Sequence, residues 1–182
     1  MINLPQQDQP KQGLPPCSLS WHCTWLLRHV REGKVIWRLE DHNLLMKGGG
    51  RAIVDTIVRD NGTSYFIETD WFVGLYRGTV SRSTVLATIP GEPSGNGYSR
   101  SQCERSSVGF PTLEVDSEDY WRVVSKELTI TASGGSIGPV DGAFLCTSSG
   151  SSGTLIGTIA TGVQRTILAG DSMIAQLMIR FK

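Results

Sequence analysis

The sequence has no excess of charge of either sign, since 17 acidic residues balance 17 basic residues among 182. The basic residues form no stripe, so the electrostatic surface that nucleic acid requires is missing and no nucleic-acid partner is expected. No apolar run approaches the roughly 18 residues of a membrane-spanning helix, so no membrane partner is expected either. The length fits one domain with an appendage, large enough to bury a core without covalent staples.

Cysteine is scarce, and its positions, Cys17, Cys23, Cys103 and Cys146, are too few and too scattered for a disulfide framework. The first residues, MINLPQQDQPKQGLPP, lack the charged and then apolar design of a secretory signal. We therefore expect synthesis in a cytoplasm, with most thiols reduced. Cys146 lies in the apolar run AFLCT, where a small core residue is expected.

Catalytic motifs are also missing, because no serine stands in a G-x-S-x-G elbow. His42 follows Asp41, but a catalytic triad is a spatial arrangement that neighbours in sequence do not indicate. Cys103 has no better support as a nucleophile. The glycines at 48–50 lack the Lys and Ser/Thr of a phosphate-binding loop, which favours a flexible joint. We predict that the protein is not an enzyme and has no catalytic residue and no cofactor.

Two clusters contain side chains that can bind metals. The first combines sulfur and imidazole ligands suited to zinc: Cys17, His22, Cys23 and His29. It has no C-x-x-C or H-x-x-x-H pair, so a packed patch is the preferred interpretation. The second offers carboxylates suited to calcium: Glu114, Asp116, Glu118 and Asp119. It lacks the EF-hand pattern and is expected to be a solvated loop, so no metal site is predicted.

The N-terminal region differs from the rest of the chain. Residues 1–18 are rich in Pro, Gln and Gly and poor in apolar side chains, and the prolines exclude a helix. Such a segment is either a disordered tail or an extended arm that becomes ordered on a partner. Residues 19–30 fit a short helix or a strand equally well. We expect residues 1–42 to form an extended arm with a short aromatic segment, and residues 43–182 to form one β-sandwich domain.

Alternation of apolar and polar residues dominates the rest of the chain. It is clearest at the C-terminal end, where Met173, Ala175, Leu177 and Ile179 share one face. Turn clusters of Gly, Pro, Ser and Asn separate the runs. The expected strands are residues 34–40, 65–69, 71–76, 84–88, 97–104, 120–131, 140–147, 154–159, 164–169 and 172–181. With one short amphipathic helix at 51–59, the pattern predicts a mainly β fold, an antiparallel β-sandwich or jelly roll.

Aromatic side chains offer one further functional hypothesis. Trp71, Tyr98, Tyr120 and Trp121 could line a surface on which a sugar stacks. Aromatic residues in alternating strands more often lie in a core or in a subunit interface. The sequon at 61–63 matters only in a secreted eukaryotic protein, which no other feature indicates.

From about residue 43 to the end, the order of features resembles small structural proteins of tailed-phage virions. The pieces that carry the resemblance are HNLLMKGGGRAIVDTIV, WFVGLYRGT, GEPSGNGYSR, Phe110-Pro111, the segment 120–158 and RTILAGDSM. In that family a short helix precedes a strand of the WFVGLY type. A turn ending in Tyr-x-Arg follows, then a β-rich body, an Ala-Gly-Asp turn and a last strand.

The resemblance implies a non-enzymatic virion protein, made in a bacterial cytoplasm, that commonly assembles as a homotrimer. The expected partners are the major capsid protein or other virion proteins. The first hypothesis is a capsid decoration or cement protein whose residues 1–42 reach onto a neighbouring subunit. The alternatives are a collar, tail or fibre-attachment protein of the virion and, from another class, a carbohydrate-binding module.

Overall fold

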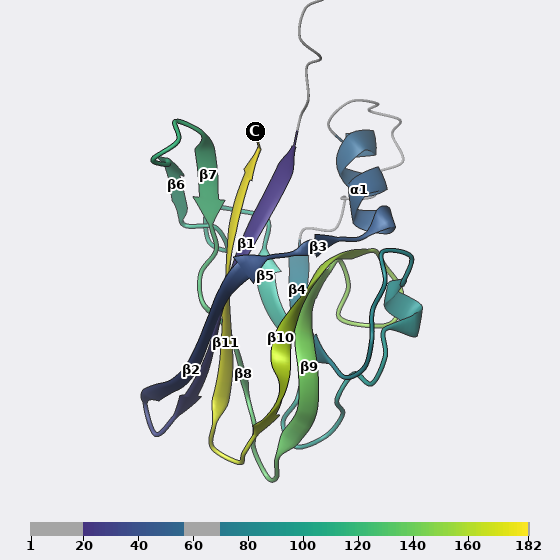
Figure 1. Ribbon diagram of the computed structural model, residues 1–182, viewed down its shortest axis with the longest axis vertical. Coiled ribbons are helices and arrows are strands. Elements are labelled where there is room, and N and C mark those ends of the chain that lie inside the picture. The colour runs from purple at the N-terminus through teal and green to yellow at the C-terminus, as the bar shows by residue number, and fades with distance from the viewer. Residues whose placement is uncertain (1–19, 57–69, 182) are drawn as a thin grey trace, which may run out of the picture.

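Strands make up most of the chain that the computed structural model describes, which comprises residues 20–56 and 70–181. They form two antiparallel sheets that lie face to face, with one α-helix near one end among the described residues (Figure 1). The expectation of a mainly β, sandwich-like fold with one short helix is confirmed. The first 19 residues of the predicted arm and the predicted strand at 65–69 lie outside the described residues.

Each sheet has its own strand order. Sheet A has six strands in the order β2-β1-β11-β7-β6, with β8 also paired to β11. Its strands are β1 Trp21–Arg31, β2 Lys34–His42, β6 Thr112–Val115, β7 Trp121–Val124, β8 Leu128–Thr131 and β11 Ser172–Phe181. Sheet B has five strands in the order β3-β10-β9-β4-β5. Its strands are β3 Leu44–Leu45, β4 Asp70–Tyr76, β5 Ser101–Glu104, β9 Ile137–Cys146 and β10 Leu155–Ile167.

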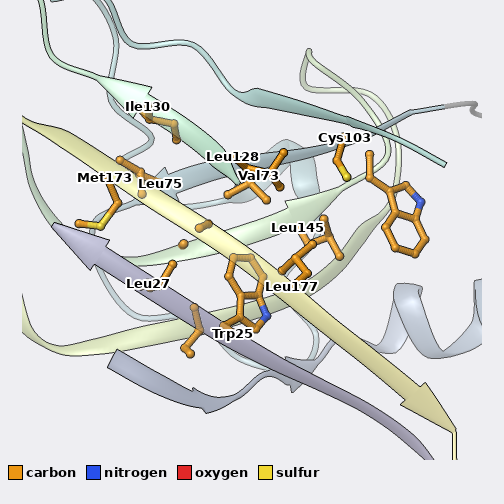
Figure 2. Close-up of a cluster of buried hydrophobic side chains, with 14 of the residues drawn as sticks. Trp25, Leu27, Val73, Leu75, Cys103, Leu128, Ile130, Leu145, Met173 and Leu177 are labelled. Carbon is orange, nitrogen blue, oxygen red and sulfur yellow. The ribbon is translucent and has the colours of Figure 1, made fainter. Parts of the chain in front are cut away.

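The hydrophobic core fills the space between the two sheets. From sheet A, Trp25, Leu27 and Leu177 point inward, and Val73 and Leu145 of sheet B meet them (Figure 2). Burial alternates along β11, as its sequence predicts. Burial also alternates along β1, so a slip of one residue in register between β1 and β11 would expose the whole apolar face of a strand. The alternation therefore fixes how β1 and β11 pair. The strands β4, β9 and β10 of sheet B are instead buried at consecutive residues, because a second apolar cluster, with Tyr76 and Phe144, covers their other face.

The expected boundary after residue 42 is corrected by the structure. Residues 21–42 form β1 and β2, a hairpin whose first strand pairs with β11 over ten residue pairs. Glu32 and Gly33 close the hairpin with φ values of 49° and 74°, the left-handed conformation that favours glycine in two-residue hairpin loops. Residues 19–30, left open between helix and strand, are thus largely a strand. This hairpin belongs to the sandwich, not to an arm.

Several predicted strands have different bounds in the structure. Residues 86–88 of the expected strand 84–88 form a short 3₁₀ helix instead. The two strands expected at 154–159 and 164–169 are one continuous strand, β10. The strand expected at 120–131 is divided into β7 and β8, because its backbone bulges at 125–127. There Ser125 keeps the contact with β11, since its Oγ accepts a hydrogen bond from the Leu177 N–H at 2.9 Å.

Helix α1, Lys47–Val54, begins four residues earlier than predicted. The glycines at 48–50 therefore form its first turn and are not a flexible joint. The reason is close packing, because a Cβ atom on Gly49 would lie 2.3 Å from the backbone oxygen of Ile156 in β10. Only glycine lets the helix backbone lie directly on the strand. Ala52 and Ile53 then point into the core.

One end of the sandwich is built differently from the other. The first residue of β1 and the last residue of β11 lie there, and the β6–β7 hairpin projects beside them (Figure 1). Trp21 is paired with Phe181 in this position. The inward face of sheet A continues onto the hairpin, where Leu113 is 65% exposed. Sheet B therefore leaves part of that face uncovered.

Candidate functional site

An apolar cleft opens at this end of the molecule. Its volume is about 430 Å³, within the range of roughly 300–1,000 Å³ typical of ligand pockets. Four aromatic residues contribute to its wall: Trp21, Trp71, Phe110 and Phe181. We call it the apolar cleft. Because its lining is mainly apolar, an occupant would be held chiefly by burial of its own apolar surface.

The four aromatic side chains are packed edge to face in a row. The ring centroids lie 5.2 Å apart for Trp21 and Phe181, 6.5 Å for Trp21 and Trp71, and 5.7 Å for Trp71 and Phe110. This is the arrangement that the charge distribution of aromatic rings prefers. Trp21, Phe181 and Trp71 come from strands β1, β11 and β4, and only Phe110 comes from a loop. The wall is therefore held by the sheets themselves.

The loop from Arg105 to Gly109 forms the polar rim of the cleft. The guanidinium of Arg105 lies 5.7 Å from the centre of the Trp71 ring, and burial lowers its pKa. Gly109 fixes the loop on the neighbouring strand, because a Cβ atom there would lie 1.9 Å from the backbone oxygen of Glu104. Ser106 and Ser107 complete the rim and add hydroxyl groups. The Ser106 hydroxyl donates to Glu104 Oε2 at 3.3 Å and accepts the Val108 N–H at 3.1 Å. The rim is thus polar while the wall is apolar.

The β6–β7 hairpin extends the apolar surface beyond the cleft. Leu113 lies opposite Val123, and Val115 lies opposite Trp121, so all four side chains share one face of the hairpin. Leu113 and Val123 line the cleft, whereas Val115 and Trp121 are 46% and 65% exposed. We call these four residues the hairpin strip. A contiguous apolar patch of this kind is typical of an interaction site.

The opposite face of the same hairpin is polar. Arg122 donates to Glu114 Oε1 at 2.6 and 2.8 Å, and Arg180 of β11 forms ion pairs with Asp116 and Glu118 in the turn. Three of the four carboxylates that suggested a calcium site are thus paired with arginines. Asp119 occupies the turn with φ 66°. The cluster fastens the hairpin to β11, and no group of three metal-binding side chains is found in the described parts of the chain.

The structure separates the residues considered as zinc ligands. Cys23 and His29 point inward from β1, whereas His22 belongs to the opposite face of the strand. His29 Nε2 lies 2.9 Å from Asp171 Oδ2 and is buried. Cys23 is enclosed in the core, where burial raises the pKa of its thiol to about 12. Cys17 lies outside the described residues.

The residues considered for nucleophilic catalysis occupy unrelated positions. Burial raises the pKa of Cys103 to about 11, so its thiolate is disfavoured at neutral pH. Cys146 is buried as predicted, and burial raises its pKa as well. His42 Nδ1 lies 3.2 Å from Thr24 Oγ1, whereas Asp41 Oδ1 accepts the backbone N–H of His42. The neighbouring Asp41 therefore binds the main chain of His42 in place of its ring.

The four aromatic residues of the sugar-stacking hypothesis do not form one surface. Trp71 is buried in the wall of the cleft. The hydroxyl of Tyr98 donates to Glu92 at 2.8 Å and accepts the Leu75 N–H at 3.0 Å, and burial is the main reason that its pKa is raised. Tyr120 lies beside Arg180, 6.0 Å from ring centre to guanidinium. Trp121 alone presents a largely exposed ring.

Two of the segments that suggested a phage protein hold the sandwich together. In the first, Arg100 forms an ion pair with Glu92 at 2.7 Å and donates to the carbonyl oxygen of Ser148 at 2.6 Å. In the second, Asp171 accepts hydrogen bonds from Arg31 at 2.8–3.1 Å and contacts His29. Both segments therefore have a role in stability that needs no ligand.

Sequence reasoning missed the hairpin strip. It placed the residues around 114–120 in a solvated loop and gave β6 no strand. The signal lay in two short alternations, TLEV and WRVV, on either side of the polar turn DSEDY. Two strands that close together predict a hairpin, and their apolar residues then share a face. The turn itself was correctly expected to be polar.

Comparison with known proteins does not assign the chain to a family. The chain matches no protein-family model, and a search of curated proteins finds no significant similarity. Within residues 20–56 and 70–181, no helix has the length and apolar character needed to cross a membrane. The function must therefore be inferred from the apolar cleft, the hairpin strip and the sequence itself.

Proposed function

We propose that this chain is a non-enzymatic structural protein of a tailed-phage virion, which works by docking onto other protein surfaces. The observation that carries the proposal is the continuous apolar surface formed by the apolar cleft and the hairpin strip. Its centre is aromatic and its rim is polar, with Arg105, Ser106 and Ser107 at one edge. Protein interfaces have the same composition, with aromatic side chains at the core and polar groups around them.

The rest of the molecule suits a rigid support for this surface. The cleft wall rests on strands of both sheets, and Arg180 ties the base of the hairpin to β11. A preorganised surface loses less conformational entropy when a partner binds. Within a virion, many modest contacts of this kind add together around a repeating lattice, and we assign the chain first to capsid decoration. The partner is then the major capsid protein, and the decorating unit is a homo-oligomer such as a trimer.

The proposal is tested by the copy number of the chain in particles purified from the cells that make it. Quantitative mass spectrometry against the major shell protein should give one copy per shell subunit or a simple fraction of it. A dozen copies or fewer would move the chain to the collar, tail or fibre attachment. A chain that is made by the cells but absent from purified particles would contradict a virion role altogether.

A matched pair of variants connects that measurement to the site. Trp121→Glu places a charge in the hairpin strip, whereas Val163→Glu places one at a similarly exposed position on β10. We expect Trp121→Glu to reduce the occupancy of the chain on particles at least tenfold and Val163→Glu to leave it unchanged. Equal occupancy of the two variants would show that the hairpin strip is not the docking surface.

A further inference from the structure

The β6–β7 hairpin ends in an open strand edge. Sheet A runs β2-β1-β11-β7-β6, so β6 is its last strand in the described part of the chain, and Figure 1 shows it on the outer side of the hairpin. The edge of a sheet presents backbone N–H and C=O groups to which another strand can be added. We propose that β6 pairs antiparallel with β6 of a second copy of the chain, so that two copies of sheet A join into one sheet.

The hydrogen bonds within the hairpin show which backbone groups face this edge. The Asp116 N–H donates to the carbonyl oxygen of Tyr120 at 2.9 Å, in the register of the pairing between β6 and β7. Residues two apart in an antiparallel strand direct their backbone groups to the same side, so the even-numbered residues of β6 bond to β7. The N–H and C=O groups of Leu113 and Val115 therefore point away from β7, toward the open edge.

The other sheet edges are protected against the addition of a strand. At the far end of sheet A, β2 has the sequence KVIWRLEDH, and charged side chains on an edge strand oppose pairing. In sheet B, β3 has only two residues, and the loop after β5 returns to it, where Gly109 lies against the backbone of Glu104. The one charged side chain of β6, Glu114, is bonded to Arg122 of the same hairpin. Among these edges, β6 is the one best suited to pairing.

The charges along β6 select one register for a symmetric pair. A pair centred on Glu114 would place two Glu114 side chains opposite each other, and one centred on Val115 would place Glu114 opposite Asp116. Like charges directly opposite each other destabilise a sheet. A pair centred on Leu113 instead places Thr112 opposite Glu114, where the threonine hydroxyl can donate to the carboxylate. The two Leu113 residues then exchange two backbone hydrogen bonds, as the direction of their N–H and C=O groups allows.

Pro111 sets the end of this pairing. In the register centred on Leu113, Val115 lies opposite Pro111, whose carbonyl oxygen can accept the Val115 N–H but which has no N–H to return. A pair centred on Thr112 would place Leu113 opposite Pro111 and lose hydrogen bonds near its centre. The preferred register has about four backbone hydrogen bonds, two at the centre and one at each end. The contact is therefore small, and the association is expected to be weak.

The two-fold axis of such a pair is perpendicular to the joined sheet, so both copies turn the same face to the same side. The two hairpin strips then lie side by side, with Leu113 next to Leu113, and both apolar clefts open on that side. Leu113, which is 65% exposed in a single copy, becomes covered. The dimer is a property of the chain by itself and goes beyond the proposed function. Binding of the joined strips to a particle rests on the proposed function, whose homo-oligomer is then a dimer.

The first test uses the expectation that residue 113 lies opposite itself. Sedimentation equilibrium of the purified full-length chain should show a mass that rises with concentration toward that of a dimer. Leu113→Glu and Leu113→Lys should each dimerise more weakly by about tenfold or more, because like charges meet at the centre of the pair. An equimolar mixture of the two variants should regain the dimer, since opposite charges then meet. A wild-type chain that stays monomeric, or a mixture no stronger than either variant alone, would overturn the proposal.

The same pair of substitutions at Val115 is the matched control. Val115 belongs to the same strand and also lies in the hairpin strip, but in the dimer it lies about 13 Å along the strand direction from Val115 of the other copy. A mixture of Val115→Glu and Val115→Lys should therefore dimerise no better than the single variants. Recovery in the mixture at position 115 and not at position 113 would refute the register centred on Leu113.

The second test distinguishes strand pairing from a contact made by side chains alone. The N–H groups of Leu113 and Val115 become hydrogen-bonded in the dimer, so their amide hydrogen exchange, followed by NMR, should slow as the concentration of the chain rises. The N–H groups of Thr112 and Glu114 already face β7 and serve as internal controls, whose exchange should change less. If Leu113 exchanged at the same rate in dilute and concentrated samples of a chain that dimerises, β6 would not be the paired edge.

The dimer and the proposed function fail separately. A chain that is present in virions but monomeric in isolation retains the proposed function and loses the β6 pairing. A chain that dimerises in this register but is absent from particles retains the pairing and loses the virion role. The copy number in particles and the behaviour of the mixed variants therefore test different statements about the same hairpin.

Discussion

The two hairpins at the edges of sheet A differ in where they expose apolar side chains. In β1–β2, Val35 and Ile36 are 51% and 48% exposed, but they are two neighbouring residues at a register shift, where Ile36 has no partner in β1. In β6–β7, the exposed side chains Leu113, Val115 and Trp121 share one face. Scattered exposure is normal on a protein surface, whereas exposure gathered on one face indicates a site. The strand register therefore distinguishes the two hairpins, although both expose apolar residues.

The tryptophans of the two hairpins show the same contrast. Trp25 of β1 is completely buried between the sheets, and Trp37 of β2 lies under the guanidinium of Arg165, 4.4 Å from its ring centre. Trp121 of β7 is largely exposed. The first hairpin thus contributes its aromatic residues to the stability of the sandwich. The second keeps an aromatic residue at the surface, at a cost in solubility that an interaction would offset.

The largest expected effect comes from exchanging these tryptophans for alanine. Trp25→Ala should lower the free energy of unfolding by about 3–5 kcal/mol, because it leaves a cavity in the core. Trp121→Ala should lower it by less than about 1 kcal/mol, since its ring is mostly in solvent. Urea unfolding followed by circular dichroism measures both. If Trp121→Ala destabilised the chain as much as Trp25→Ala, the hairpin strip would be part of the core.

The next effect concerns the loop that supports the cleft. Gly109→Ala would place a methyl group 1.9 Å from the backbone oxygen of Glu104, so the loop must move. Such overpacking typically costs about 1–3 kcal/mol. Because Phe110 follows directly, the fluorescence of the cleft tryptophans should change as well.

Gly150→Ala is the matched control for Gly109→Ala. The nearest atom to a Cβ at Gly150 is Ser148 Oγ, at 3.9 Å, so the methyl group fits in open space. We expect a change in the free energy of unfolding within about 0.5 kcal/mol and an unchanged fluorescence spectrum. Equal effects of the two substitutions would mean that the loop is not held in place by its approach to β5.

A smaller effect is expected on acidification, because an aspartate ties each hairpin to β11. Hydrogen bonds from Arg31 and then His29 lower the pKa of Asp171 to about 2 against the opposing effect of burial. Burial would raise the pKa of Asp116, but hydrogen bonds from Arg180 and from the backbone of Tyr120 and Glu118 lower it to about 2. Both carboxyl groups have a pKa of about 3.9 in an unfolded chain.

The sign of the pH dependence follows from these shifts. A carboxyl group with a lowered pKa in the folded state stabilises the fold fully above about pH 4, and the stabilisation is lost as the pH falls through 2. The thermal midpoint should therefore fall between pH 4 and pH 2. Asp171→Asn should lower the midpoint at pH 7 and flatten this slope. An unchanged slope in both Asp171→Asn and Asp116→Asn would show that other groups control acid stability.

The fold could be predicted further from the sequence than the site could. The alternation in β11 and in β2 determined both strands locally, and the polar turns between runs indicated antiparallel sheets. The division of 120–131 into β7 and β8 was hidden, because the bulge at Ser125 depends on hydrogen bonds to Leu177 of a distant strand. The early start of α1 could not be predicted either, because the need for glycine at position 49 arises from its close approach to the backbone of Ile156 in a distant strand.

The cleft could not be predicted from the sequence, for a related reason. Its wall unites Trp21, Trp71, Phe110 and Phe181, which come from four distant parts of the chain. Each of them alone fits an ordinary core residue. Only the pairing of β1 with β11, together with the end of sheet B at β5, leaves their rings facing an opening. Periodicity describes which residues share a face, but it does not say where the opposite sheet stops.

The smallest change in stability, and the sharpest comparison, is expected from one substitution made in each hairpin. Val35→Glu and Val115→Glu replace the same residue type at 51% and 46% exposure, each in an edge strand of sheet A. Both should change the free energy of unfolding by no more than about 0.5 kcal/mol.

Their effects on assembly should differ, because only Val115 belongs to the hairpin strip. Val115→Glu should reduce occupancy on particles severalfold, and Val35→Glu should leave it unchanged. Since the two variants match in residue type, exposure and added charge, a difference between them reports the surroundings of each position. If both reduced occupancy equally, added charge alone would explain the loss, and the register argument that separates the two hairpins would not hold.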